Sequence, residues 1–174
     1  MLPLPLDDRW FAPNTATEDG LRAELNLPEN TWLMGTVGRL DPQKGQRTAL
    51  KALAQLPEHV HWVFVGDNTV DNDGDELTAL VEHAESLGVA DRAHFLDARA
   101  DVLPVYDALD AFVMTSDSET IGTVTLEALA REVPVIGTDA GGTSELLGAG
   151  RGQLVPPRNA EAVSYTHLRA HETS

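Results

Sequence analysis

Residues 111–130, AFVMTSDSETIGTVTLEALA, change from an apolar run to a polar loop and then to a helical pattern, and the fold depends on this change. The first four residues are all apolar, which is typical of a strand covered on both faces of a sheet. A polar loop follows, and the pattern predicts a helix that begins near Gly122. The first amides of a helix lack intrahelical partners and can bind an anion. We therefore expect an anion site where this strand leads into this helix.

Two carboxylates flank the expected helix start. Glu127 follows Gly122 by five residues, which is about 7.5 Å along a helix that rises about 1.5 Å per residue. This distance resembles the step from a diphosphate to a ribose, and a carboxylate can accept both hydrogen bonds of the ribose cis-diol. Glu119 in the loop could reach the hydroxyls of a sugar beyond the phosphates. The alternative is that both carboxylates only cap the helix or favour its dipole.

The rest of the chain alternates between apolar runs and helical patterns. The other strands are expected at residues 32–37, 61–66, 93–97, 133–138 and 152–156, and the other helices at 18–25, 46–56, 77–87, 103–109, 142–147 and from 159 onward, with a polar loop at 67–75. This alternation predicts right-handed crossovers and an open, doubly wound, parallel α/β sheet in a single Rossmann-like domain. Ligands of such sheets bind beyond the carboxyl ends of the strands.

A second loop places two cations at the same edge. The segment GRLDPQKG, residues 38–45, follows the first expected strand and contains Arg39 and Lys44. In a doubly wound sheet this loop and the loop before Gly122 open on one edge, so both cations and the helix start can converge on one diphosphate. Arg39 could hold two phosphate oxygens in a fork, while Lys44 supplies a compact charge. Alternatively, both are solvated surface residues.

Composition excludes several classes of function. The 174 residues suffice for one domain, and 12 basic against 28 acidic residues give a net charge of −16, which disfavours nucleic-acid binding. There are no cysteines, so disulfides and thiolate metal sites are excluded. The lack of cysteines is compatible with a reducing cytoplasm. No apolar run approaches the roughly 20 residues of a membrane span, and no export signal is expected in the first residues, MLPLPLDD. We expect a cytoplasmic protein.

Other motifs fail when their residues are counted. A calcium loop would place Thr69 and Leu80 where carboxylates are needed. His59 and His61 lack a third metal ligand, so no metal site is expected. The glycines near residue 38 do not form G-x-G-x-x-G, and no Gly-Lys-Ser/Thr closes a phosphate loop.

Five fragments occur in an order and spacing that resemble family 4 glycosyltransferases, roughly from Leu6 to Ala162. They are residues 38–45 (GRLDPQKG), 64–67 (FVGD), 118–130 (SETIGTVTLEALA), 133–146 (VPVIGTDAGGTSEL) and 152–157 (GQLVPP). The resemblance implies the GT-B fold, in which two Rossmann-like domains face each other, and the carboxyl-terminal domain that binds a nucleotide diphosphate sugar. It also implies an amino-terminal acceptor domain as partner, and retention at the anomeric carbon without a metal or other cofactor.

The same resemblance assigns roles to individual positions. Arg39 and Lys44 would hold the diphosphate, and Glu119 would contact the donor sugar. Glu127 would bind the ribose. The start of the helix, at Gly122, Thr123 and Val124, would lie near the phosphates. The end of the third strand, at Leu96, would lie near the base.

The domain boundaries expected from the sequence divide the chain into three parts. Residues 1–30 resemble an interdomain linker with a lead-in helix, and residues 31–163 form the donor domain. Residues 164–174, SYTHLRAHETS, resemble a translated adapter and are expected to be a non-native tail. The chain is then the donor half of a hexosyltransferase and is expected to be inactive alone. The alternatives are a nucleotide-binding module without catalysis, or another reaction on the same fold, such as sugar-nucleotide epimerisation or phosphorolysis.

Overall fold

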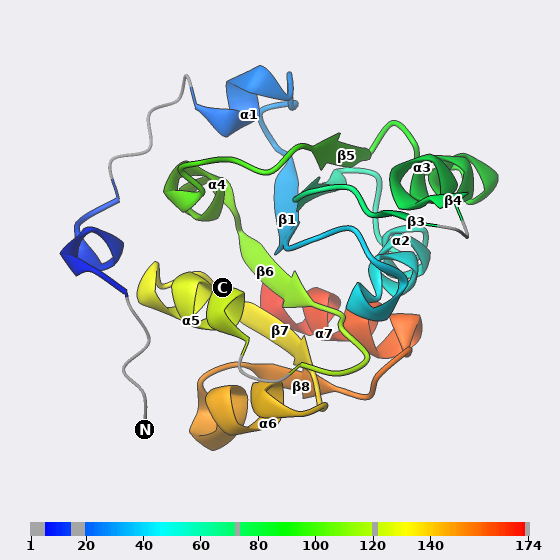
Figure 1. Cartoon of the computed structure of the whole chain (residues 1–174). Helices are drawn as coiled ribbons and strands as arrows, with labels where there is room; N and C mark the ends of the chain where they lie inside the picture. The colour runs from blue at the N-terminus through cyan, green and yellow to red at the C-terminus, as the bar shows by residue number, and fades with distance from the viewer. Residues whose placement is uncertain (1–5, 15–19, 72–73, 120–121, 173–174) are drawn as a thin grey trace.

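The computed structural model describes residues 6–14, 20–71, 74–119 and 122–172, and within them six parallel strands form one sheet (Figure 1). The strands are β1 (Trp32–Val37), β2 (Val60–Val65), β5 (Ala93–Leu96), β6 (Ala111–Met114), β7 (Val135–Thr138) and β8 (Gln153–Val155). Their order across the sheet is β5-β2-β1-β6-β7-β8. The predicted doubly wound α/β sheet is confirmed.

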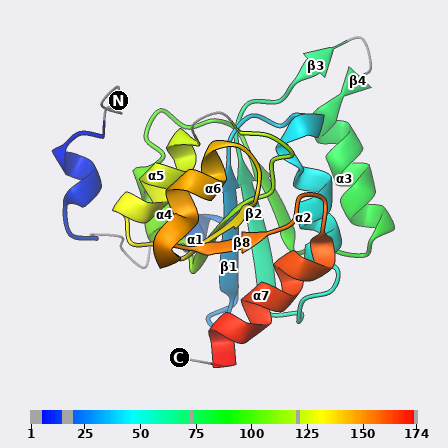
Figure 2. The same cartoon turned by 90° about the horizontal axis from the view of Figure 1, so that it is seen from below.

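Helices cover both faces of this sheet. Figure 2 shows α2, α3 and α7 on one side of the strands and α1, α4, α5 and α6 on the other. The helices are α1 (Leu21–Glu24), α2 (Gln46–Leu53), α3 (Glu76–Ser86), α4 (Leu103–Ala108), α5 (Thr123–Ala130), α6 (Gly142–Leu147) and α7 (Ala160–Glu172), with short 3-10 helices η1 (Asp8–Phe11), η2 (Pro42–Lys44) and η3 (Gly148–Gly150). Both faces of each central strand are therefore removed from water.

The two faces have separate cores because side chains alternate along each strand. In β2, Trp62 and Phe64 pack into the cluster beneath α2 and α3. Val63 and Val65 belong to the cluster beneath α4 and α5. A strand with both faces buried has no face in contact with water. This explains why these strands are near-continuous apolar runs in the sequence.

The direction of strand addition reverses between β1 and β6. From β1 the chain adds β2 and then β5 on one side, and it returns to pair β6 and then β7 and β8 on the other. The two central strands are in register at Met34 and Ala111. In open α/β sheets this switch point leaves a crevice beyond the carboxyl ends of the strands, where ligands bind.

The structure differs from the sequence-based expectation in several places, including the following three. The predicted loop at 67–75 is wrong in part, since β3 (Val70–Asp71) and β4 (Gly74–Asp75) form a short antiparallel ribbon there. The lead-in helix α1 begins at Leu21, and residues 15–19 lie outside the described residues. Helix α7 continues through the expected boundary at residues 163 and 164; the origin of the tail stays a prediction.

Within the described part of the chain, no helix has the length and apolar character needed to cross a membrane.

Candidate ligand-binding site

A cavity of about 300 Å³ lies at the switch point, between the loop that follows β1 and the loop that follows β6. The described residues that line it are Thr36, Val37, Gly38, Arg39, Lys44, Gln46, Met114, Ser116, Glu119, Gly122, Thr123 and Val124. Six of the predicted site residues are therefore brought together in this cavity, namely Arg39, Lys44, Glu119, Gly122, Thr123 and Val124. Residues 120 and 121, between Glu119 and Gly122, lie outside the described residues.

The loop after β1 is shaped by a cap and a glycine. The Asp41 side chain accepts a hydrogen bond of 2.9 Å from the Gln43 amide at the start of η2. Gly45 ends this short helix at φ +72°, and a Cβ atom there would lie 2.0 Å from the Thr115 carbonyl oxygen. Only glycine allows this approach and this φ without strain. The turn therefore carries Lys44 directly against the end of β6.

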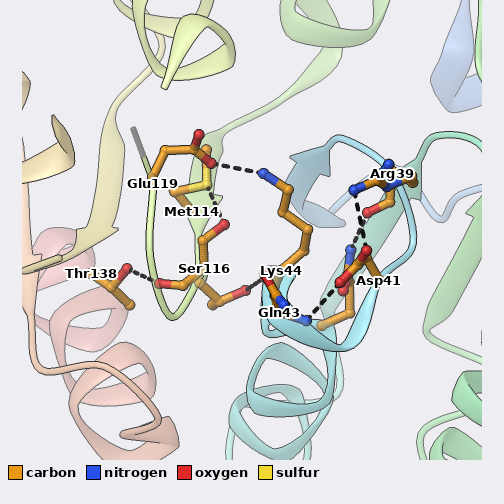
Figure 3. Close-up of polar contacts among 10 residues, drawn as sticks. Arg39, Asp41, Gln43, Lys44, Met114, Ser116, Glu119 and Thr138 are labelled. Atoms are coloured by element: carbon orange, nitrogen blue, oxygen red, sulfur yellow. Dashed lines mark hydrogen bonds and ion pairs between the residues drawn. The ribbon is translucent and has the colours of Figure 1, made fainter. Parts of the chain in front are cut away.

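The loop after β6 is fastened to its neighbours by backbone groups. The Asp117 amide donates to the Gln43 carbonyl at 3.0 Å, and the Thr138 hydroxyl donates to the Ser116 carbonyl at 2.6 Å (Figure 3). These contacts connect the loop to η2 on one side and to the end of β7 on the other. Because the loop is held through its own backbone groups at Ser116 and Asp117, it has a defined path past the cavity.

Both cations of the cavity are paired with carboxylates in this structure. Lys44 Nζ lies 2.9 Å from Glu119 Oε2, and these side chains are 31% and 16% exposed. Arg39 Nη2 lies 3.2 Å from Asp41 Oδ2, although the Arg39 side chain is 62% exposed. Figure 3 shows both pairs, Lys44 with Glu119 and Arg39 with Asp41. An anion that enters the cavity must therefore compete with Glu119 for the ammonium group of Lys44.

The start of α5 supplies the third positive element. Gly122 precedes the helix in a left-handed conformation at φ +64°, and no side chain of the described residues caps this end. The first amides of α5, at Thr123 and Val124, belong to residues that line the cavity. Uncapped amides and the positive end of the helix dipole favour a negative group at this position.

The two remaining predicted residues are not among the described lining residues. Leu96 ends β5 and packs partly against the core. Glu127 lies one turn into α5, where its Oε2 atom accepts a hydrogen bond of 2.7 Å from the Tyr106 hydroxyl. Burial, followed by the negative charge of Glu127, raises the pKa of Tyr106 far above its ordinary value, so the phenol keeps its proton and remains a donor.

Tyr106 is a functional candidate that reasoning from the sequence missed. It lies in the helix expected at 103–109 and follows the apolar pattern of that helix, so it reads as an ordinary core aromatic. The available signal is chemical: a buried tyrosine requires a partner for its hydroxyl. The sequence alone does not show that the partner is Glu127.

No metal centre is found in the part of the chain that the structure describes, where no three His, Asp or Glu side chains cluster closely enough to hold an ion. His61 Nδ1 and His94 Nε2 lie 3.0 Å apart and share a hydrogen bond across β2 and β5. Burial lowers the pKa of both rings.

Comparison with known proteins gives one consistent result. Residues 17–169 match the family described as glycosyl transferases group 1. The lipopolysaccharide core biosynthesis mannosyltransferase LpcC of Rhizobium leguminosarum bv. viciae is 34% identical over 165 residues, which cover 91% of this chain and 46% of that protein.

Solved structures agree in fold. The Anabaena protein Alr3699/HepE, in complex with UDP and glucose, has a TM-score of 0.87 and 31% identity over 96% of this chain and 45% of that one. The carboxyl-terminal domain of a group 1 family protein, LpcC of Francisella tularensis, has a TM-score of 0.78 at 24% identity, over 96% of this chain and 88% of that domain, which is a likeness of fold.

This chain spans less than half the length of the Rhizobium and Anabaena proteins. Its Rossmann-like sheet, the cavity at the switch point and the match over residues 17–169 agree with one another. The chain belongs to the group 1 glycosyltransferases of the GT-B fold and corresponds to their carboxyl-terminal domain.

Proposed function

We propose that this chain binds a nucleotide diphosphate sugar as the donor half of a retaining hexosyltransferase. The observation that carries the proposal is the cavity at the switch point, where Arg39, Lys44 and the uncapped start of α5 surround one anion-sized space. The complex of the similar Anabaena protein with UDP and glucose supports it. An amino-terminal domain of the whole protein would hold the acceptor across the cavity.

Each part of the donor is assigned to a different group of residues. The amides of Thr123 and Val124, with Arg39 and Lys44, take the diphosphate. Glu119 lies beside Lys44 on the cavity wall and faces the sugar. Glu127, one turn further along α5, takes the ribose, and the base lies toward the end of β5 at Leu96.

The proposed chemistry needs positive charge where the diphosphate departs. The bond between the anomeric carbon and the diphosphate oxygen breaks, and a bond to the acceptor oxygen forms on the same face of the sugar. The proton of the acceptor hydroxyl is taken up by the departing diphosphate. Lys44, Arg39 and the amides of α5 stabilise the negative charge that develops there. No metal is required, because these groups supply the charge.

Transfer is proposed for the whole protein and donor binding for this chain. Positioning an acceptor hydroxyl beside the anomeric carbon contributes much of the rate of a two-substrate reaction. The chain spans less than half of its relatives, so we expect it to bind the donor without transferring the sugar.

Nucleoside diphosphates are expected to stabilise the chain in a thermal-shift experiment. A panel of uridine, adenosine and guanosine diphosphates is added to the folded chain. A ligand at 100 times its dissociation constant adds about 2.7 kcal/mol, which for a domain of this size is a rise in melting temperature of about 5–10 °C. Replacing Glu127 with alanine is expected to reduce the response to the best nucleotide and to leave inorganic pyrophosphate unchanged.

Two results would contradict this assignment. If no nucleoside diphosphate shifts the melting temperature of a sample that unfolds cooperatively, the chain has no donor site. If Glu127→Ala weakens pyrophosphate as much as the nucleotide, the carboxylate has no role at the ribose. Substituting Glu85, which is exposed on α3, with alanine is the matched control.

Removing the charge of Glu119 is expected to tighten the binding of inorganic pyrophosphate. Glu119→Gln frees Lys44 from its partner at 2.9 Å, and a partly exposed ion pair of this kind is worth about 1 kcal/mol. We expect an affinity gain of about fivefold, measured by calorimetry at low salt and compared with Glu85→Gln. An unchanged or weaker affinity would show that Lys44 does not bind the anion.

A further inference from the structure

The hydroxyl of Tyr106 lies between two groups of α5. It donates to Glu127 Oε2 at 2.7 Å, and the Val124 carbonyl oxygen is a second, longer acceptor at 3.3 Å. Tyr106 is on α4 and is completely buried, whereas Glu127 is partly exposed. One buried group from a neighbouring helix thus holds a partly exposed carboxylate that lies one turn along α5 from the residues that line the cavity.

The ring of Tyr106 has little freedom to move. Trp10 of η1 packs edge-on against it, with ring centroids 5.7 Å apart and an interplanar angle of 68°. The ring centroid of Phe112 in β6 also lies 5.6 Å from that of Tyr106. The phenol also keeps its proton, as described above. Tyr106 therefore offers a donor at a fixed point beneath α5.

A glutamate without such a partner samples many rotamers, and ordering them opposes binding. The hydrogen bond to Oε2 fixes the carboxylate of Glu127 and leaves Oε1 for another donor. We infer that Tyr106 is a positioning residue for nucleotide recognition, which holds Glu127 in the orientation that accepts the hydroxyls of the ribose. This inference rests on the proposed function, since it assigns Glu127 to the ribose.

A purely structural role for the Tyr106 hydroxyl leads to a different expectation. If the hydroxyl only satisfies a buried polar group, its removal lowers stability and affects all ligands of the cavity alike. If it positions Glu127, the loss falls on the ribose hydroxyls alone. The decisive quantity is the ratio of the affinity for a nucleoside diphosphate to the affinity for its 2′,3′-dideoxy counterpart.

The experiment uses the chain with Tyr106→Phe, which keeps the ring and its contacts with Trp10 and Phe112. The probes are the nucleoside diphosphate with the largest thermal shift, its 2′,3′-dideoxy counterpart and inorganic pyrophosphate. We expect the first affinity to fall about tenfold, while the affinities for the other two stay within about twofold. Tyr165→Phe, at a tyrosine that is 60% exposed on α7, is the matched control.

A double-mutant cycle with Glu127→Ala separates this inference from the proposed function. In the Glu127→Ala background, Tyr106→Phe is expected to have no further effect on the affinity ratio. If Glu127→Ala abolishes the preference for ribose and Tyr106→Phe leaves it intact, the positioning role is overturned while the donor site stands. If Glu127→Ala itself retains the preference, the ribose role of Glu127 fails, and the inference fails with it.

Discussion

Replacing Arg131 with alanine is expected to lower the free energy of unfolding by about 3–5 kcal/mol, which is the usual cost of leaving a buried charge without its partner. The side chain follows α5 and binds Asp107 at 2.6 Å, and these side chains are only 3% and 4% exposed. It also donates to the carbonyl groups of Trp10 and Ala12. Chemical denaturation should show the loss, with a fall in melting temperature of about 10 °C.

The matched control is Arg9→Ala. Arg9 pairs with Asp7 at 3.3 Å, but both side chains are more than half exposed, so the expected loss is less than about 1 kcal/mol. Equal losses for the two variants would show that burial does not strengthen the dependence on Arg131. A small loss for both would mean that water reaches Asp107 once the guanidinium is gone.

Gly141→Ala is expected to destabilise the chain by about 3 kcal/mol or more and to displace the loop that holds Glu119. A Cβ atom at Gly141 would lie 2.1 Å from the Glu119 carbonyl oxygen, and the residue adopts φ +56°. The same carbonyl accepts a hydrogen bond of 2.7 Å from the Gly142 amide. Denaturation measures the stability, and hydrogen exchange should show that the Gly142 amide loses protection.

Gly148→Ala is the control for this change. No atom lies within 4 Å of a Cβ atom at that position, and its φ of −54° suits any residue. The loss there should be within about 0.5 kcal/mol. If Gly141→Ala costs no more stability than Gly148→Ala, the loop that contains Glu119 can move to make space for the Cβ atom. The start of α6 then does not fix the position of Glu119.

The strands could be predicted because burial on both faces removes polar residues from them. The bounds of β1 and β6 agree with their apolar runs. The run at 133–138 was less informative, since β7 begins only at Val135. The Val133 amide donates to the Ala128 carbonyl at 3.0 Å, so this residue closes the end of α5 before the strand starts. An apolar run records burial and does not separate a helix end from a strand.

The ribbon of β3 and β4 could not be predicted in the same way. Each strand has two residues, which is too short for an alternating pattern to develop. Its sequence has the mostly polar composition of a loop, and the pairing of Val70 with Asp75 depends on how the chain folds back.

The types of residue in the candidate site could be predicted, but their partners could not. Arg39, Lys44 and Gly122 follow apolar strands, so the topology brings them to one edge. The pairing of Lys44 with Glu119 depends on a distance between residues that are 75 positions apart in the sequence. The contacts of Tyr106 and Arg131 were hidden because a tyrosine in an apolar helix and an arginine at a helix end look ordinary.

The switch point also affects how the chain must fold. The contacts that join β1 to β6 close long loops, as shown by Thr36 and Val113, which are 77 positions apart. Such contacts form slowly, because the entropy of the intervening chain opposes them. The cavity is lined by residues of both strands and of the loops that follow them, so neither half of the sheet forms it alone. Recovery of ligand binding during refolding should therefore follow the pairing of β1 with β6 and lag behind the formation of helices.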